Sequence, residues 1–203
     1  QHPTIRFSSA ENAGIGAASN RAINLGKGEL ILQLDGDDIL DASAASTLVN
    51  AAKAGAVVAY GNFRRIDPDG AFIDDGWEEP RFSRERLLRS MIVHHPRLFR
   101  RDAWESIGGH SEDLTNAVDY DLFLRLSEVG SFNHVRSILY SYRILESSTS
   151  RSKQEIQTEN TYKVVRDSLR RQQKSGWSIY VPNVSHPRRF VWIDTRFATS
   201  EPK

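Results

Sequence analysis

The chain has 203 residues, and its 27 Lys and Arg almost balance its 26 Asp and Glu, so the formal net charge of +1 gives no overall field that would select nucleic acid or a membrane. The length suits one domain, alone or with an appendage. Cysteine is absent, which excludes disulfides and thiolate metal sites, and no apolar run approaches the roughly 20 residues of a membrane span.

The expected elements alternate between helices and strands. A helix is expected to end across 20–25 before Gly26, and the apolar run 30–34 reads as a strand. Asp41 is placed to cap an alanine-rich helix running toward Ala54. A second strand is expected to follow this helix.

That second strand is expected over 56–60, and a hairpin follows it. Its strands, 63–66 and 71–73, flank Asp67-Pro68-Asp69-Gly70, whose Pro and Gly suit a tight turn. The remaining expected elements are short helices over 84–91 and 102–107, an amphipathic helix over 119–129, a strand within 132–142, and a long helix from the capping box Ser152-Lys153-Gln154-Glu155 toward Lys174. The order predicts an α/β domain over 1–176, with 177–203 as a tail or docking segment.

Carboxylates gather where the strand over 30–34 ends. Asp35, Asp37 and Asp38 follow it directly. Ligands of open α/β sheets bind beyond the carboxyl ends of strands, where hard oxygens suit Mg²⁺ or Mn²⁺ with a phosphorylated ligand. The alternative is a solvated turn, because Asp and Gly favour turns regardless of function. A metal-diphosphate site and a plain turn both remain open from these residues alone.

Several motifs in a fixed order resemble the GT-A glycosyltransferases of family 2. They are Asn12-Ala13-Gly14, Ala18-Ser19-Asn20, Gly28-Glu29, Leu34-Asp35-Gly36-Asp37-Asp38, and Asp119-Tyr120-Asp121-Leu122 with Arg125. More narrowly, 94–99, 116–121 and 126–130 resemble the glucuronyltransferase half of bacterial chondroitin and hyaluronan synthases. The resemblance covers about residues 5–176. It implies a GT-A fold, a Rossmann-type mixed sheet flanked by helices.

The resemblance also implies a reaction. It is an inverting transfer from a UDP-sugar, with glucuronate favoured, to a hydroxyl of an oligosaccharide or polysaccharide acceptor. Such chemistry needs Mn²⁺ or Mg²⁺ to neutralise the leaving diphosphate and a base to take the acceptor proton. The implied location is the cytoplasm, with peripheral contact to the inner face of the membrane or to a partner protein left open, and no nucleic acid is expected as a partner.

Specific roles follow from the matching motifs. Asp37 is expected as the direct metal ligand, Asp35 toward the ribose or a metal-bound water, and Asp38 as support. Asp119 is expected as the catalytic base, although Val118 stands where the family usually has Glu. An Asp at a helix start is also a good cap, and the two roles can coexist.

The donor side of the site draws on further residues. The expected donor-binding residues are Asn12, Gly14, Asn20, Asp35, Asp38, His95 and Arg97. His94 and His95 are adjacent on an extended segment, so their side chains point to opposite faces and we expect only His95 at the site. The alternative places one histidine in the core and one in solvent. Asp121 and Arg125 have helical spacing and are expected to form a surface ion pair.

Two departures from the family pattern matter. Leu145 stands where many members have a metal-binding His, so Glu146 is the expected replacement as third ligand. Nothing before Ile5 can supply the family's opening strand and its uracil-binding residues. We therefore expect a fragment of a longer protein, with part of the donor pocket absent and a sheet edge exposed.

Rival interpretations come from the same residues. A haloacid-dehalogenase-like phosphohydrolase would use Asp35 as nucleophile, but Ile39 replaces the usual Thr or Val. An EF-hand is excluded because its Gly and Glu positions fall on Leu40 and Ser46. A non-catalytic module that binds a glycan or a partner enzyme is the remaining alternative.

A basic helix closes the domain. Its cations, with two from the tail, are Lys163, Arg166, Arg170, Arg171, Lys174, Arg188 and Arg189. They could hold an acidic polymer or a membrane surface. Because Glu155, Glu159 and Asp167 interleave with them, a solvated helix face is the favoured interpretation.

Overall fold

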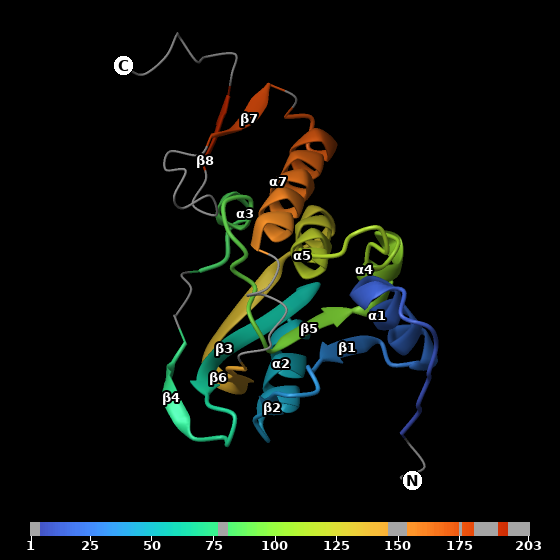
Figure 1. The fold of residues 1–203 in the computed structure, drawn as a ribbon, viewed down its shortest axis with the longest axis vertical. Coiled ribbons are helices and arrows are strands. Elements are labelled where there is room, and N and C mark those ends of the chain that lie inside the picture. Colours follow the sequence, from blue (N-terminus) through green and yellow to red (C-terminus); the bar gives the residue numbers. More distant parts are fainter. Residues whose placement is uncertain (1–4, 77–80, 146–153, 175, 181–190, 195–203) are drawn as a thin grey trace.

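The computed structural model describes residues 5–76, 81–145, 154–174, 176–180 and 191–194. Its centre is a 6-stranded mixed sheet with the order β1-β5-β3-β6-β2, and β4 pairs with β3 (Figure 1). The strands are β1 (Leu30–Gln33), β2 (Ile39–Leu40), β3 (Val58–Ile66), β4 (Phe72–Asp75), β5 (Arg97–Arg100) and β6 (Phe132–Arg143). Strands β3 and β6 run parallel and the other pairs antiparallel. The predicted mixed α/β architecture is confirmed.

Helices flank this sheet. They are α1 (Gly14–Leu25), α2 (Ala44–Ala52), α3 (Arg84–Leu87), α4 (Arg101–Ser106), α5 (Val118–Val129) and α7 (Gln154–Arg171). Beyond α7, β7 (Trp177–Tyr180) and β8 (Val191–Asp194) form an antiparallel pair in a segment for which no regular element was expected. Within the described ranges, no helix combines the length and the apolar character needed to cross a bilayer.

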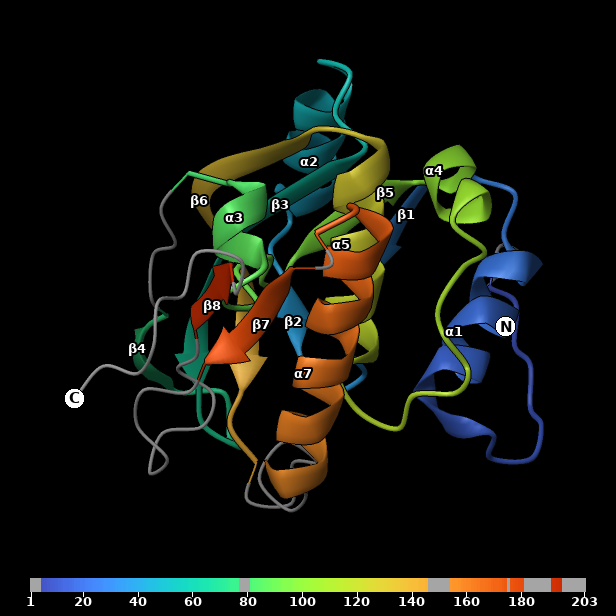
Figure 2. The same ribbon diagram turned by 90° about the horizontal axis from the view of Figure 1, so that it is seen from above.

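Apolar side chains cover both faces of the sheet. Successive residues of a strand point to opposite faces, so Val58 and Tyr60 belong to one buried cluster, whereas Ala59 belongs to the other. Phe99 and Leu98 divide in the same way on β5. Helix α2 covers the face of Ala59, and α5 covers the opposite face (Figure 2). Strands β3 and β5 are therefore buried on both sides.

Local sequence patterns account for α5 and for the β3–β4 hairpin. Leu122 and Leu126 recur at helical spacing and are fully buried, as the periodicity predicts. In the hairpin turn, Asp67 Oδ1 accepts hydrogen bonds from the backbone N–H groups of Asp69 and Ala71 at 3.0 and 2.8 Å. Both predicted elements are confirmed.

The expected break between 56–60 and 63–66 is wrong. The two segments form one continuous strand, β3. Gly61 lies within it, and a Cβ atom there would stand 3.1 Å from Leu139 and 3.3 Å from Pro96. Glycine at this position therefore allows neighbouring chain segments to approach closely, and it does not mark a turn.

Helix boundaries also differ in detail. Asp41 does not cap α2 directly, because the helix begins at Ala44 after Ser43. Instead, Asp41 Oδ1 accepts hydrogen bonds from Ser43 N and Oγ at 2.9 and 2.6 Å, which holds the turn leading into the helix. Helix α3 ends at Leu87, short of the predicted residue 91. The expected capping box rests on 152–153, which lie outside the described residues.

Candidate active site

The acidic turn lies between the two edge strands of the sheet. Strand β1 ends at Gln33, and the turn that follows is closed by a 3.2 Å hydrogen bond from Asp38 N to Asp35 O. Gln33 pairs with Arg97, because β5 runs antiparallel to β1. The start of β5, including His95 just before it, therefore lies beside the carboxyl end of β1.

Strand β6 holds the acidic turn in place. The Tyr140 hydroxyl donates to Asp38 Oδ2 at 2.8 Å and accepts from Asp35 N at 3.3 Å. The backbone N–H of Arg143 donates to Asp38 Oδ1 at 2.7 Å, and its Nε donates to Asp37 O at 2.7 Å. Both oxygens of Asp38 thus have protein donors, which suits the supporting role expected for it.

Three side chains in this region could hold a cation. Among the described residues, Asp35, Asp38 and His95 each offer a ligand atom, and these atoms lie within 4.8 Å of one another. Asp35 Oδ2 stands 3.6 Å from His95 Nδ1. The two carboxylates offer hard oxygens that suit Mn²⁺ or Mg²⁺, and the imidazole adds a nitrogen ligand that a transition metal accepts more readily than Mg²⁺. Glu146, the expected third ligand, lies outside the described residues.

The surroundings shift the protonation of these groups. Burial raises the pKa of Asp35, the positive charge of Arg97 opposes that rise, and the negative charge of Asp38 adds to it. Burial also raises the pKa of Asp38, against the hydrogen bonds that Arg143 and Tyr140 donate. The pKa of His95 lies well below its usual value because of burial, followed by the charge of Arg97. His95 is therefore neutral and able to act as a ligand.

Asp37 differs from its neighbours on the turn. Its side chain is exposed, and it is not part of the cluster formed by Asp35, Asp38 and His95. Its backbone carbonyl, held by Arg143, is what ties it to β6. The residue expected as the direct ligand thus lies on the turn but outside the group of ligand atoms that the fold brings together.

Asp119, a carboxylate that does not belong to the acidic turn, lies on the first turn of α5. Arg97 Nη2 donates to Asp119 Oδ2 at 3.0 Å, and Arg97 Nε donates to Val93 O at 2.9 Å. The Arg97 guanidinium also lies 5.1 Å from the centre of the Phe123 ring. The side chain of Arg97 is 9% exposed and that of Asp119 is 47% exposed. Asp119 is therefore accessible to a ligand while a buried arginine fixes its orientation.

Asp119 also serves the start of α5. Its Oδ1 accepts a hydrogen bond from Tyr120 N at 2.8 Å. The residue at the helix start is Ala117, which has a left-handed backbone with φ of 60° and no side chain that could cap. Asp119 is therefore not the N-cap residue, and its carboxylate accepts from one backbone N–H of the first turn through Oδ1 and from Arg97 through Oδ2.

Asp35 and Asp119 line the same cavity, which has a volume of about 520 Å³. Its lining residues are Asn12, Ile15, Ser19, Gln33, Asp35, His95, Arg97, His110, Thr115, Asn116, Ala117, Val118, Asp119 and Gln157. Of the residues expected to bind the donor, Gly14, Asn20 and Asp38 are not among them. Asn12 Oδ1 accepts from Gly14 N at 3.0 Å, so Gly14 shapes the loop that carries Asn12. The cavity has carboxylate, guanidinium and amide groups in reach of one ligand.

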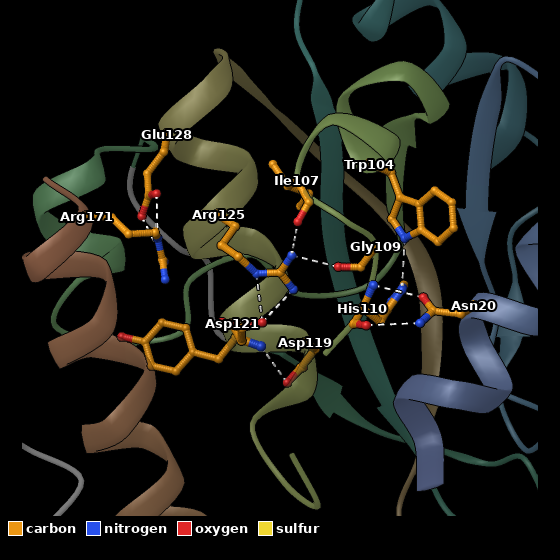
Figure 3. Close-up of polar contacts among 11 residues, drawn as sticks. Asn20, Trp104, Ile107, Gly109, His110, Asp119, Asp121, Arg125, Glu128 and Arg171 are labelled. Carbon is orange, nitrogen blue, oxygen red and sulfur yellow. Dashed lines mark hydrogen bonds and ion pairs between the residues drawn. The ribbon is translucent and has the colours of Figure 1, made fainter. Parts of the chain in front are cut away.

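His110 was not identified from the sequence, and it organises one wall of this cavity. Trp104 Nε1 donates to His110 Nδ1 at 3.1 Å, and Gln33 lies 3.2 Å from His110 Nε2. Asn20 Oδ1 accepts from His110 N at 2.8 Å, while Asn20 Nδ2 donates to His110 O at 3.0 Å (Figure 3). Asn20, expected at the donor, therefore fixes the His110 backbone. A lone His and a lone Gln carry no sequence pattern that could have revealed this.

The expected surface ion pair between Asp121 and Arg125 is buried, which corrects that prediction. The two side chains are 10% and 14% exposed. Arg125 Nη1 also donates to Ile107 O and Gly109 O at 2.8 and 2.7 Å (Figure 3). The pair therefore anchors the loop between α4 and α5, which leads from His110 to Asp119.

The other histidine and the basic helix have structural partners. His94 lies against the Phe63 ring, with a centroid distance of 5.6 Å, and does not belong to the group formed by Asp35, Asp38 and His95. On α7, Arg170 pairs with Asp167 at 3.1 Å, and Arg171 pairs with Glu128 of α5 at 2.8 Å. Both arginines therefore form ion pairs with acidic side chains.

Comparison with known proteins gives sequence matches over most of the chain. Residues 2–108 match the family model Glycosyl transferase family 2. The chain is 41% identical over 195 residues to the chondroitin synthase of Escherichia coli, covering 94% of this chain and 28% of that protein. It is 42% identical over 173 residues to the hyaluronan synthase of Pasteurella multocida, covering 84% and 18%. The chain thus spans less than a third of the length of these relatives, and the predicted resemblance to them is confirmed.

A solved structure supports the fold assignment. TarS of S. aureus, residues 1–349, superposes with a TM-score of 0.58 at 14% identity, covering 78% of this chain and 46% of that one. At such identity the likeness concerns the fold alone. It confirms the predicted GT-A type of fold.

Proposed function

The chain belongs to glycosyltransferase family 2, and we propose that it carries the reaction centre of a metal-dependent, inverting transfer of a sugar from a UDP-sugar to a glycan hydroxyl. The observation that carries this proposal is the shared cavity of Asp35 and Asp119, one at the end of β1 and one at the start of α5. In this proposal, Asp35 helps to hold the cation that neutralises the leaving diphosphate, and Asp119 takes the proton of the attacking hydroxyl.

The leaving side of the reaction needs positive charge. Asp35, Asp38 and His95 would hold Mn²⁺ or Mg²⁺, with the exposed Asp37 as a further ligand on the same turn. When bound, such an ion neutralises charge on the departing diphosphate. Tyr140 and Arg143 keep the turn in one conformation by hydrogen bonds to Asp38, as outer partners of metal ligands commonly do.

The attacking side needs a base. Asp119 takes the proton of the acceptor hydroxyl as that oxygen forms a bond to the anomeric carbon of the sugar. The bond from that carbon to the diphosphate breaks, and UDP leaves with the electron pair. Attack from the face opposite the diphosphate inverts the anomeric configuration. Arg97 holds Oδ2 of Asp119 during this step.

We favour glucuronate as the transferred sugar. Arg97 uses Nε for Val93 and Nη2 for Asp119, while its Nη1 has no hydrogen-bond partner in the part of the chain that the structure describes. Arg97 is one of the residues that line the cavity, and a guanidinium N–H group matches the carboxylate of a uronic acid. The chondroitin and hyaluronan synthase names of the relatives support the same choice and point to polysaccharide synthesis.

Calorimetric titration with UDP, UDP-glucuronate and UDP-N-acetylglucosamine, each with and without Mn²⁺, tests the proposal. We expect Mn²⁺-dependent binding that Asp35→Asn abolishes. Asp69→Asn, an equal charge change in the exposed β3–β4 turn, should leave binding intact. Metal-independent binding, or equal binding by both variants, would overturn the proposed site. A preference for UDP-N-acetylglucosamine would overturn glucuronate alone.

A further inference from the structure

Gln33 and His110 form a polar pair in the wall of the cavity, apart from the acidic turn. Gln33 is the last residue of β1 and pairs with Arg97 across the sheet. His110 is 4% exposed, yet it borders the cavity with Gln33, Asp35 and Asp119. No step described above uses either residue. Their hydrogen bonds, however, determine which group Gln33 presents to a ligand.

The tautomer of His110 follows from its neighbour Trp104. An indole N–H can only donate, so His110 Nδ1, 3.1 Å from Trp104 Nε1, must accept and carries no hydrogen (Figure 3). Burial, followed by the positive charge of Arg125, lowers the pKa of His110 to about 4. The ring is therefore neutral at neutral pH, and its hydrogen resides on Nε2.

That hydrogen fixes the orientation of the Gln33 amide. The structure places the nitrogen of the Gln33 amide, Nε2, 3.2 Å from His110 Nε2. An N–H₂ group cannot accept from Nε2–H, so the atom facing His110 must be the carbonyl oxygen, since amide orientation is assigned from such networks. The N–H₂ group then occupies the other end of the amide. Among the described residues, no group donates a hydrogen bond to the atom at that other end.

Asn20 makes this arrangement rigid. Its amide bonds both N and O of the His110 backbone, while Trp104 holds the imidazole ring (Figure 3). His110 cannot rotate to offer Nδ1 to Gln33 without leaving a buried indole N–H unpaired, which is costly. Gln33 therefore presents donors in the cavity that Asp35 also lines.

We propose that Gln33 contacts the UDP-sugar donor through its amide N–H₂, which donates a hydrogen bond to an oxygen of the diphosphate or the sugar, and that His110 is the positioning residue that sets this orientation. The proposal rests on the proposed function and adds a recognition contact to the same cavity. Its chemistry complements the carboxylates of Asp35 and Asp119, which can only accept hydrogen bonds when ionised.

Two variants separate a ligand contact from a structural one. Gln33→Glu keeps an oxygen for His110 Nε2–H but lacks the N–H₂ group, whereas Gln33→Met lacks both. A ligand contact predicts that donor affinity falls about 10-fold or more in both variants. A role limited to holding His110 predicts that Glu restores affinity and Met does not. Loss with UDP assigns the contact to the diphosphate, and loss with UDP-sugar alone assigns it to the sugar.

Nuclear magnetic resonance of the wild-type chain tests the same contact without the negative charge that Gln33→Glu introduces. We expect the His110 ring to show a hydrogen on Nε2 at pH 7 and the Gln33 N–H₂ signals to shift when the donor binds. A hydrogen on Nδ1, or unshifted Gln33 signals during demonstrable donor binding, overturns this inference while leaving the proposed function intact. Absence of donor binding by the wild-type chain overturns the proposed function itself.

Discussion

Arg97 donates a hydrogen bond from Nη2 to Oδ2 of Asp119 across 3.0 Å, joining a buried cation to an accessible carboxylate. Arg97 is also held by Val93 O and by the face of Phe123. The carboxylate therefore has a fixed direction toward the cavity before any ligand arrives. Preorganisation of this kind is what a general base requires, because proton transfer depends first on geometry.

Asp119→Asn should remove turnover while leaving donor binding in place. The amide keeps the size of the carboxylate but cannot take a proton, so we expect kcat to fall about 10²- to 10⁴-fold. Turnover is measured as UDP release with an acceptor oligosaccharide, beside calorimetric binding of UDP. Asp102→Asn, which alters the exposed Arg100–Asp102 pair, is the matched control. Retained turnover in Asp119→Asn would exclude Asp119 as the base.

Arg97→Met should lower the stability of the fold. The substitution leaves the Val93 carbonyl without its donor and removes the cation from the Phe123 ring. We expect the free energy of unfolding to fall by about 1–3 kcal/mol, the cost of an unpaired buried polar group. Urea denaturation measures it. Arg100→Met, in the exposed pair with Asp102, should leave the urea midpoint unchanged, and equal midpoints for both variants would refute the structural account of Arg97.

Tyr140→Phe should weaken the cation site without unfolding the chain. The hydroxyl bridges Asp35 N and Asp38 Oδ2, so its loss frees one end of the acidic turn. Outer partners of metal ligands typically contribute 10- to 100-fold in affinity, and we expect about a 10-fold loss in Mn²⁺ binding by calorimetry. Tyr180→Phe is the control, because Tyr180 lies on β7, in a sheet apart from the acidic turn. Equal Mn²⁺ affinity in the two variants would contradict this role of Tyr140.

Local patterns predicted the elements, and long-range pairing decided the site. The period of Leu122 and Leu126 revealed α5 because a buried helix face is a local property. Asp35 and His95 were each expected at the site, but their contact depends on the pairing of β1 with β5, which no local pattern encodes. The ion pair of Asp121 with Arg125 was expected at the surface, but it is buried because the loop between α4 and α5 packs against it. The helical spacing of the two residues does not encode that contact.

The pH dependence of stability should report the buried His110. Its pKa is about 4 in the folded chain and 6.5 in the reference state, with burial as the main cause. Below pH 6.5 the unfolded chain binds the proton that the folded chain excludes, so stability is fully present above pH 6.5 and is lost as the pH falls toward 4. The shift corresponds to about 3 kcal/mol at most.

His110→Gln removes this titration while keeping polar atoms for Trp104 and Gln33. Urea denaturation at pH 7 and pH 4.5 should show a smaller pH effect in the variant than in the wild type. His95, whose pKa is also lowered, leaves a residual slope in both proteins. Identical pH effects in wild type and variant would mean that His110 already titrates normally and is not held neutral by the fold.

Gly16→Ala should disrupt the wall of the cavity by steric contact alone. A Cβ atom on Gly16 of α1 would stand 2.0 Å from the backbone oxygen of Ser111, a contact that only movement of the chain can relieve. Ser111 follows His110, so the clash would push apart α1 and the loop that Asn20 fastens to it. Overpacking of this kind typically costs about 1–3 kcal/mol.

Gly26→Ala provides the comparison for Gly16 because it lies at the end of the same helix. Its Cβ atom would meet Ile23 O at 3.4 Å and the flexible end of Arg101 at 3.5 Å, which are ordinary contacts. The midpoint temperature of thermal unfolding should therefore fall by several degrees for Gly16→Ala and stay near the wild-type value for Gly26→Ala. If the two variants unfold at the same temperature, the packing of α1 against Ser111 does not stabilise the chain.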